Sequence, residues 1–214
     1  MQRKILVLVG ASGVGKTTVA DCILNSSSRF ALVRSVTTRA PRGDGRDDEY
    51  IYIDREEFLS RAKNGGLIEY TEYGDNLYGT PVSELERIFA SGKIPLLILD
   101  IEGVKSLRKG AFDFGAVAVY IWDTLDTVEK RLLARDLAEP TEKKIESFNK
   151  RISMNVRDYR SMPDIAHLFD MFVRNGGRVD ECAEKITDAF FSESFDSSEK
   201  LKIANSLYEM ATLK

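Results

Sequence analysis

One short segment constrains this chain more than any other feature. Residues 10–17 read Gly-Ala-Ser-Gly-Val-Gly-Lys-Thr and fit the pattern G-x-x-x-x-G-K-[ST] in full. An apolar run at residues 5–9 precedes the segment, and the spacing of Val19, Cys22 and Ile23 after it predicts an amphipathic helix. A glycine-rich turn between a strand and a helix is the setting in which such a loop binds phosphate groups, so the sequence predicts a triphosphate site here.

The residue types in this segment suit an anion. Glycine lets backbone N–H groups approach a phosphate closely and reach positive φ. The helix start adds a partial positive charge, Lys16 adds a full one, and the Thr17 hydroxyl can bind Mg²⁺. Because GTPases, ATPases and kinases of several metabolites all use such a loop, the acceptor has to be identified from the rest of the chain.

Composition narrows the class of protein. The 214 residues carry 31 Lys and Arg against 34 Asp and Glu, a net charge of −3, which argues against a dedicated nucleic-acid-binding surface. Every apolar run is shorter than the roughly 20 residues that a membrane helix needs, and the run at residues 5–9 is also too short for a signal peptide. Cys22 and Cys182 lie far apart and are expected to be buried thiols. We therefore expect a cytoplasmic protein that binds neither nucleic acid nor membrane.

Apolar runs alternate with helix-period segments, a pattern typical of a parallel sheet covered by helices. The runs that predict strands are residues 5–9, 30–33, 94–99, 116–122 and 168–173. Thr80 is expected to cap a helix whose first turn holds Pro81. Two stretches interrupt the alternation: residues 34–80, which predict a small α/β lobe, and the charged residues 126–160, which are broken at Pro140. The expected organisation is a core of residues 1–33, 81–125 and 161–191, the lobe at 34–80, a lid at 126–160 and a helical tail at 192–214.

Five further segments resemble the guanylate kinase family, in its order and close to its spacing. They are residues 35–42 (SVTTRAPR), 49–50 (EY), 68–69 (IE), 76–80 (NLYGT) and 100–104 (DIEGV). With the phosphate loop and later arginines, the resemblance covers about residues 4–190. It implies an α/β fold with a three-layer P-loop core on a parallel sheet, an inserted GMP-binding lobe and a helical lid. It also implies Mg²⁺-dependent phosphoryl transfer from ATP to GMP or dGMP, in purine nucleotide metabolism.

Several residues in these segments suit the phosphate of an acceptor. Arg39 and Arg42 are three apart with a proline between them, a rigid pair that can fork onto a phosphate. Tyr50 and Tyr78 can donate phenolic hydrogen bonds to the same dianion. Alone, each of these residues would more often be a solvated loop residue or a packing aromatic. It is their combination behind a complete phosphate loop that predicts a site.

The base contacts follow from guanine's chemistry and from the resemblance. Guanine presents N1–H and an exocyclic amine side by side, a pair of donors that a carboxylate accepts and that adenine lacks. The resemblance assigns this contact to Glu69, with Asp100 assisting at the amine and Ser35 and Thr80 supplying hydroxyls. We expect the metal to be held by Thr17 and Asp100. The resemblance places ATP on the loop residues Ala11, Ser12, Gly13, Val14, Gly15, Lys16, Thr17 and Thr18.

Catalysis is expected to rest on cations rather than on a general base. The phosphate oxygen of GMP is already ionised, so His167 is expected at the surface or in packing. Arg131 and Arg135 lie four apart on one helix face, and Arg151 stands on the next helix. These three resemble the family's lid arginines and join Lys16 and Arg39 as the expected catalytic set.

The chain also departs from the family pattern. The segment between Arg42 and Tyr50 is one residue short and acidic, Ile98 stands where the family has an acid, and the lid between Arg135 and Arg151 is about five residues longer. The tail at 192–214 is extra and is expected to pack on the core or form a dimer contact, so the protein is expected to be a monomer or a homodimer. Two alternatives stay open: a non-catalytic guanylate-kinase-like interaction module, and a kinase for a different phosphorylated acceptor.

Overall fold

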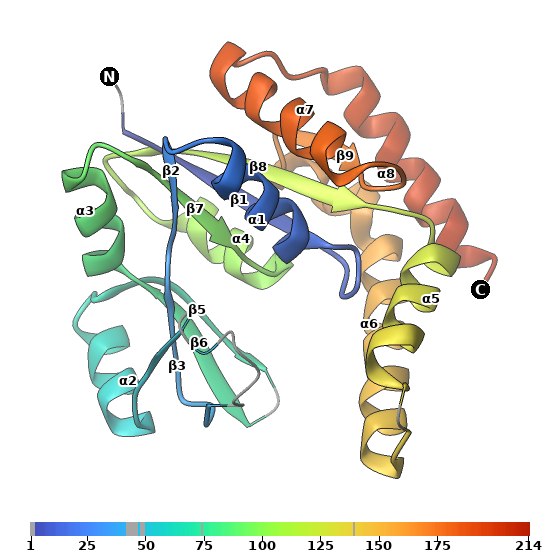
Figure 1. Cartoon of the computed structure of the whole chain (residues 1–214), viewed down its shortest axis with the longest axis horizontal. Helices are drawn as coiled ribbons and strands as arrows, with labels where there is room; N and C mark the ends of the chain where they lie inside the picture. Colours follow the sequence, from blue (N-terminus) through green and yellow to red (C-terminus); the bar gives the residue numbers. More distant parts are fainter. Residues whose placement is uncertain (1–2, 42–46, 48–49, 74, 139) are drawn as a thin grey trace. The chain divides into compact units, whose positions relative to one another are not determined.

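The computed structural model describes residues 3–41, 47, 50–73, 75–138 and 140–214. The chain divides into two compact units. Figure 1 labels most of the helices and strands named below. The first unit holds residues up to 7 and 24–116, and the second holds residues 8–23 and 117–214. Three elements run through the division: β1 (Lys4–Gly10), α1 (Lys16–Ser26) and β8 (Gly115–Trp122).

In the first unit, parallel strands carry the predicted core pattern. The strand order is β2 (Phe30–Leu32), β7 (Ile94–Ile98) and β1, and β2 pairs with β7 in parallel register with Phe30 opposite Ile94. The helices α3 (Val82–Ala90) and α4 (Ile101–Lys109) flank β7 in the sequence. Asp100 caps α4, because its Oδ1 accepts a hydrogen bond from the Gly103 backbone N–H at 2.7 Å.

The same unit holds a second sheet, whose strands lie within residues 35–81. Its order is β4 (Tyr50–Tyr52), β3 (Ser35–Thr37), β6 (Asn76–Pro81) and β5 (Leu67–Tyr73). β3 and β4 pair in parallel, whereas β6 pairs antiparallel with both β3 and β5. The helix α2 (Arg55–Lys63) starts at the Asp54 cap, whose side chain accepts from the Glu57 backbone N–H. Val36, Phe58 and Leu77 form the buried centre of this lobe.

The second unit carries the phosphate loop and the helices that follow β8 in the sequence. β8 pairs in parallel with β9 (Met171–Arg174), with Val119 opposite Met171. The helical elements are α5 (Leu125–Asp136), α6 (Glu142–Ile165), η2 (Ala166–Leu168), α7 (Val179–Ser192) and α8 (Ser197–Thr212). The chain breaks between α5 and α6 around Pro140, as predicted, but α6 continues past residue 160, where the sequence suggested the end of the lid.

The tail forms α8, which packs along α6 through Ala204, Leu207 and Ala211. The Arg160 side chain of α6 donates to the Ala211 carbonyl at 3.2 Å. The tail is therefore part of the second unit. Among the described residues, no helix combines the length and the apolar character needed to cross a membrane.

Two local expectations from the sequence are wrong. Thr80 does not cap α3, because it lies in the β6 ladder opposite Glu69 and its hydroxyl donates to that carboxylate; Pro81 occupies the cap position instead. The strand predicted at residues 168–173 begins only at Met171, because residues 166–168 form the 3₁₀ turn η2. Leu168 is buried, and an apolar run alone does not distinguish a buried turn from a strand.

The centre of the lobe gives a direct test of its packing. Phe58→Ala removes a ring that is 0% exposed, so we expect the free energy of unfolding to fall by about 3–5 kcal/mol. Leu59→Ala is the matched control, because Leu59 on the same helix is 49% exposed. Urea denaturation of both variants measures the difference, and equal losses would contradict the assignment of Phe58 as the centre of the lobe.

Candidate functional site

The phosphate loop adopts a backbone that favours glycine at three of its positions. Gly10 has φ +153°, Gly13 has φ +85° and Gly15 has φ +99°. A Cβ at Gly13 would lie 2.5 Å from Leu132 Cγ, and one at Gly15 would lie 2.5 Å from the Asn175 side-chain nitrogen. The strand–loop–helix setting predicted from the sequence is present, since the loop joins β1 to α1.

The Lys16 side chain folds back onto the loop. Its Nζ donates to the carbonyl oxygens of Gly10 and Ala11 at 2.7 and 3.0 Å. Thr17 is partly exposed in the first turn of α1, and Thr18 is exposed. A cation and a helix start thus meet at one place, which favours a bound anion.

Two asparagines that the sequence analysis did not identify form hydrogen bonds with backbone groups of the loop. Asn155 on α6 pairs with both backbone groups of Ser12: its Oδ1 accepts from the N–H at 2.8 Å and its Nδ2 donates to the carbonyl at 2.9 Å. Asn175, after β9, donates from Nδ2 to the Val14 carbonyl at 2.9 Å. Both residues are buried. The one available signal was the amide at position 155, three residues after Ile152 and four before Tyr159, a spacing that places the amide on the same helix face as these apolar side chains.

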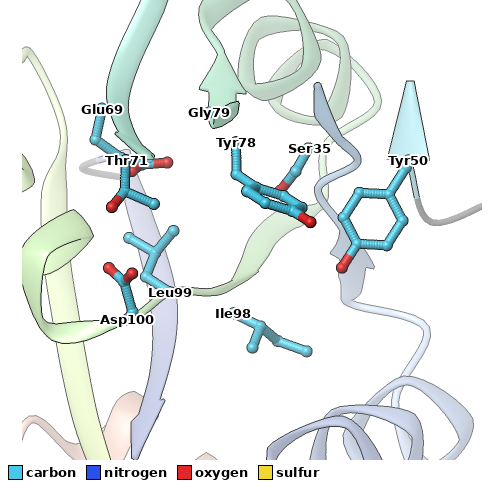
Figure 2. A pocket seen from close by; sticks show the side chains of 9 residues that line it. All are labelled: Ser35, Tyr50, Glu69, Thr71, Tyr78, Gly79, Ile98, Leu99 and Asp100. Atoms are coloured by element: carbon cyan, nitrogen blue, oxygen red, sulfur yellow. The ribbon is translucent and has the colours of Figure 1, made fainter. Parts of the chain in front are cut away.

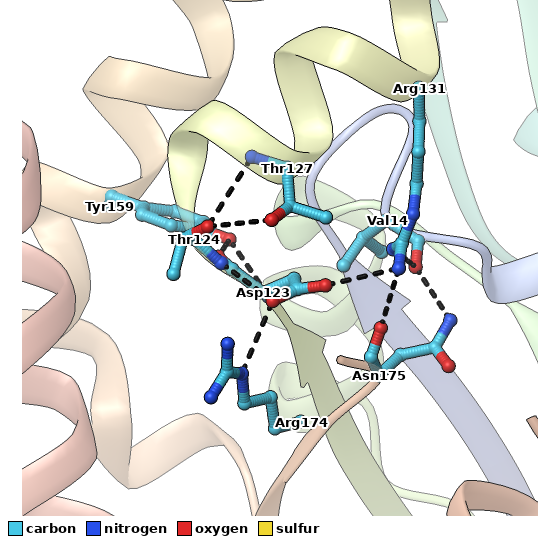
Figure 3. Close-up of polar contacts among 8 residues, drawn as sticks. All are labelled: Val14, Asp123, Thr124, Thr127, Arg131, Tyr159, Arg174 and Asn175. Carbon is cyan, nitrogen blue, oxygen red and sulfur yellow. Dashed lines mark hydrogen bonds and ion pairs between the residues drawn. The ribbon is translucent and has the colours of Figure 1, made fainter. Parts of the chain in front are cut away.

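Arg131 lies against the loop. Its guanidinium donates to the carbonyl oxygens of Val14 and Asn175 at 3.3 and 2.9 Å, and it forms a 3.1 Å ion pair with Asp123 (Figure 3). Asp123 directly follows β8 and its side chain is 0% exposed. The structure therefore places Arg131 at the loop and pairs it with Asp123, a carboxylate that the sequence analysis did not identify.

The other two lid arginines share a different carboxylate. Arg135 Nε lies 2.7 Å from Asp136 Oδ1, and Arg151 Nη1 lies 3.1 Å from Asp136 Oδ2. Partial burial would raise the pKa of the Asp136 carboxyl, but the hydrogen bond from Arg135 and the nearby positive charges outweigh it and lower the pKa. Asp136 thus stays ionised and joins α5 to α6.

A pocket of about 290 Å³ in the first unit gathers five of the predicted acceptor-site residues. They are Ser35, Tyr50, Glu69, Tyr78 and Asp100, and Thr71, Gly79, Ile98 and Leu99 complete the lining. Figure 2 shows the carboxylates of Glu69 and Asp100 on one side of the pocket and the two tyrosine rings on the other. The pocket therefore has an acidic side and an aromatic side that presents hydroxyl groups.

Glu69 is the buried polar centre of the acidic side. It is 6% exposed, and the hydroxyl of Thr80 donates to its Oε1 at 2.6 Å. Oε2 lies close to the first turn of α4, where a Cβ on Gly103 would come within 3.0 Å of it. Burial raises the pKa of Glu69 to about 7, and the charge of Asp100 adds to this effect, while hydrogen bonds from Thr80 oppose it. Glu69 can therefore gain or lose a proton near neutral pH.

Arg39 supplies a cation beside the aromatic side. Its carbon Cζ lies 5.1 Å from the centre of the Tyr50 ring, and one nitrogen donates to the Tyr52 hydroxyl at 3.4 Å. Nε and Nη1 are buried, and no described residue accepts a hydrogen bond from them. A buried guanidinium with open donors fits an anion. Arg42, its predicted partner, lies outside the described residues.

The last predicted residues to place are the metal ligand Asp100 and the single histidine. Asp100 lies in the pocket lining, with Oδ1 already engaged at the α4 cap. The described residues contain no group of three or more His, Cys, Asp and Glu side chains that could hold a metal ion. His167 is exposed, with Nδ1 3.0 Å from the Asp164 carbonyl, as expected for a surface residue.

Comparison with known proteins agrees with the resemblance. The family model described as guanylate kinase matches residues 2–193. A guanylate kinase from Thermus thermophilus is 33% identical over 177 residues, covering 82% of this chain and 75% of that protein, and one from Lactiplantibacillus plantarum is 33% identical over 201 residues, covering 91% and 90%. The crystal structure of guanylate kinase from Anaplasma phagocytophilum aligns with a TM-score of 0.64 at 26% identity, covering 92% of this chain and 88% of that one.

The raised pKa of Glu69 makes stability depend on pH. An acid whose pKa rises from 4.5 to about 7 on folding binds more protons in the folded state between these values, so this group destabilises the fold as pH increases through that window. The full effect is about 3 kcal/mol. We expect Glu69→Gln to gain stability over the parent chain at pH 8 relative to pH 5.

Urea denaturation at the two pH values measures this gain. Glu72→Gln is the matched control, because Glu72 lies on the same strand with a side chain that is 55% exposed. A difference between Glu69→Gln and the parent chain that stays constant from pH 5 to pH 8 would contradict the raised pKa.

Proposed function

The chain belongs to the guanylate kinase family, and we propose that its second unit holds ATP and its first unit holds GMP for phosphoryl transfer between them. One observation carries the acceptor assignment. The first unit combines a buried carboxylate in a pocket with a buried guanidinium whose donors lack acceptors among the described residues. These are the two groups that the opposite ends of GMP require: an acceptor for the base and a cation for the phosphate.

Glu69 is proposed to recognise guanine. As a carboxylate it accepts from N1–H and from the exocyclic amine, and Asp100 on the same side of the pocket assists at the amine. Thr80 holds Oε1 of Glu69, and Ser35 lines the same pocket with its hydroxyl. Adenine presents an acceptor at N1 and would leave the buried carboxylate unpaired, which a polar pocket rejects strongly.

The phosphate of GMP is assigned to the aromatic side. Arg39 and Arg42 are proposed to neutralise it, and Tyr50 and Tyr78 to donate phenolic hydrogen bonds. The open nitrogens of Arg39 support this assignment, because the described residues leave them without an acceptor.

ATP is assigned to the phosphate loop, residues 11–18. Lys16 exchanges its carbonyl partners for phosphate oxygens, and Arg131 already lies at the loop. An ionised phosphate oxygen of GMP attacks the γ-phosphorus in line, and the bond from that phosphorus to the β-bridging oxygen breaks. Arg135 and Arg151 are proposed to move from Asp136 to the transferring group, so charge neutralisation and positioning supply the catalysis.

The residues present fit Mg²⁺ only as a lightly held ion. Mg²⁺ commonly keeps several waters and takes one or two protein ligands beside phosphates, and the Thr17 hydroxyl at the start of α1 is such a ligand. Asp100 is the second proposed ligand, through Oδ2, since Oδ1 caps α4. When bound, the ion would neutralise negative charge on the phosphate groups.

The remaining assignments follow from the same premise. We place the enzyme in the cytoplasm as a monomer or homodimer, with residues 126–160 as the lid. The complete phosphate loop with its glycine backbone and its lysine supports an enzyme over a non-catalytic interaction module, for which ATP contacts would serve no purpose. The acidic pocket supports GMP over another phosphorylated acceptor.

An ADP-release assay with ATP, Mg²⁺ and five acceptors tests the function. We expect turnover with GMP and dGMP but not with AMP, CMP or UMP. Glu69→Gln places an amide donor against guanine's donors, so KM for GMP should rise about 100-fold or more while KM for ATP changes less than about twofold. Glu72→Gln is the control, and equal weakening of both substrates would remove Glu69 from the acceptor site.

Lys16→Met tests the separation of the two sites. The substitution keeps the length of the side chain but removes the cation of the loop, so we expect turnover to fall by about 10³-fold or more. Calorimetry should still detect GMP binding with a Kd within about threefold of the parent value. Loss of GMP affinity in this variant would contradict the placement of the acceptor in the other unit.

A further inference from the structure

We infer that Asp123 is a positioning residue for the nucleotide on the phosphate loop, because its buried carboxylate fixes Arg131 against Val14. This inference rests on the proposed function, since it takes the loop to be the ATP side. Asp123 belongs neither to the loop nor to the predicted lid at 126–160. Its place is the end of β8, directly before the Thr124 cap of α5.

Three neighbouring residues hold the backbone and one carboxylate oxygen of Asp123 in place. Its Oδ1 accepts from the Thr124 backbone N–H at 2.9 Å and forms an ion pair with Arg174 Nε at 3.2 Å (Figure 3). The carbonyl of Asp123 accepts from the Tyr159 hydroxyl at 2.7 Å. These contacts fix the backbone and the side chain together, so Oδ2 faces Arg131 from a rigid support.

The ion pair with Asp123 orients the Arg131 side chain. Its two other contacts, the Val14 and Asn175 carbonyls, are neutral acceptors, and the Asn175 amide also binds the Val14 carbonyl. The contact with Asp123 is an ion pair, and the attraction between two opposite charges at a buried carboxylate is stronger than the attraction of a guanidinium for a neutral carbonyl. Without the charge of Asp123, the long arginine side chain would regain rotamer freedom at the loop.

The charge balance indicates an anion rather than a cation as the ligand of this cluster. Two guanidinium groups face one carboxylate, which leaves a formal charge of +1. The carboxylate is 0% exposed, whereas the arginine side chains are 37% and 53% exposed. Asp123 therefore pairs with both guanidinium groups from a buried position, while the two arginine side chains remain partly accessible to solvent. A buried ion pair contributes little net stability compared with apolar packing, so positioning accounts for it better than stabilisation does.

ADP binding measured by calorimetry tests the inference without requiring turnover. Asp123→Asn keeps the shape of the side chain but removes its charge, and we expect the Kd for ADP to rise about tenfold. The Kd for GMP should change less than about twofold. Thr127→Ala is the matched control, because its hydroxyl contacts Thr124 at 2.8 Å in the same turn and has no hydrogen bond to Arg131 among the described residues. We expect Thr127→Ala to leave both Kd values unchanged.

A double-mutant cycle separates positioning from a general structural effect. In an Arg131→Ala background, Asp123→Asn should weaken ADP by less than about twofold, because the residue that it positions is gone. If Asp123→Asn alone does not fold, the same substitution is measured in an Arg174→Met background, where one arginine fewer faces the lost charge. An unchanged Kd for ADP, a full loss in the Arg131→Ala background, or an equal loss of GMP affinity would each overturn the inference. If the parent chain binds ADP but does not phosphorylate GMP, the proposed function fails, while the cycle still tests Asp123.

Discussion

Positive charges that lie close together repel one another, and the second unit compensates four of them with acceptors of its own. Lys16 contacts two loop carbonyls, Arg131 pairs with Asp123, and Arg135 and Arg151 pair with Asp136. Under the proposed function, nucleotide binding would exchange these oxygens for phosphate oxygens. Side chains that are already ordered lose less conformational entropy in such an exchange, which is the physical basis of preorganisation.

The first unit solves the opposite problem, the burial of a negative charge. Glu69 lies 6% exposed beside Asp100, and its pKa of about 7 shows what this placement costs the folded state. Under the proposed function this cost has a use, since a buried carboxylate with remaining acceptor capacity favours a base that supplies two donors. Burial of Glu69 would therefore lower the stability of the fold while it increases the selectivity for guanine.

The sequence reveals those parts of the fold that depend on local pattern. The phosphate loop can be predicted because close approach to an anion requires glycine at fixed spacing. The pocket residues can be predicted because they lie in short motifs that resemble one family. Asn155, Asn175 and Asp123 are different. Asn155 meets Ser12 across 143 positions of sequence, and a single amide or carboxylate carries no periodicity that would mark it. Thr80 was misread for a related reason: its pairing with Glu69 across a ladder outweighed the local preference for a helix cap.

The bond between Asn155 and Ser12 gives α6 a fixed point part of the way along its length. Arg151 lies four residues from that point, about 6 Å along the helix axis, while the start of the helix at Glu142 lies about 20 Å away. A small tilt about Asn155 displaces the far end roughly three times as much as it displaces Arg151. Arg151 therefore lies on the part of α6 that Asn155 restrains most, and its ion pair with Asp136 adds a second restraint there.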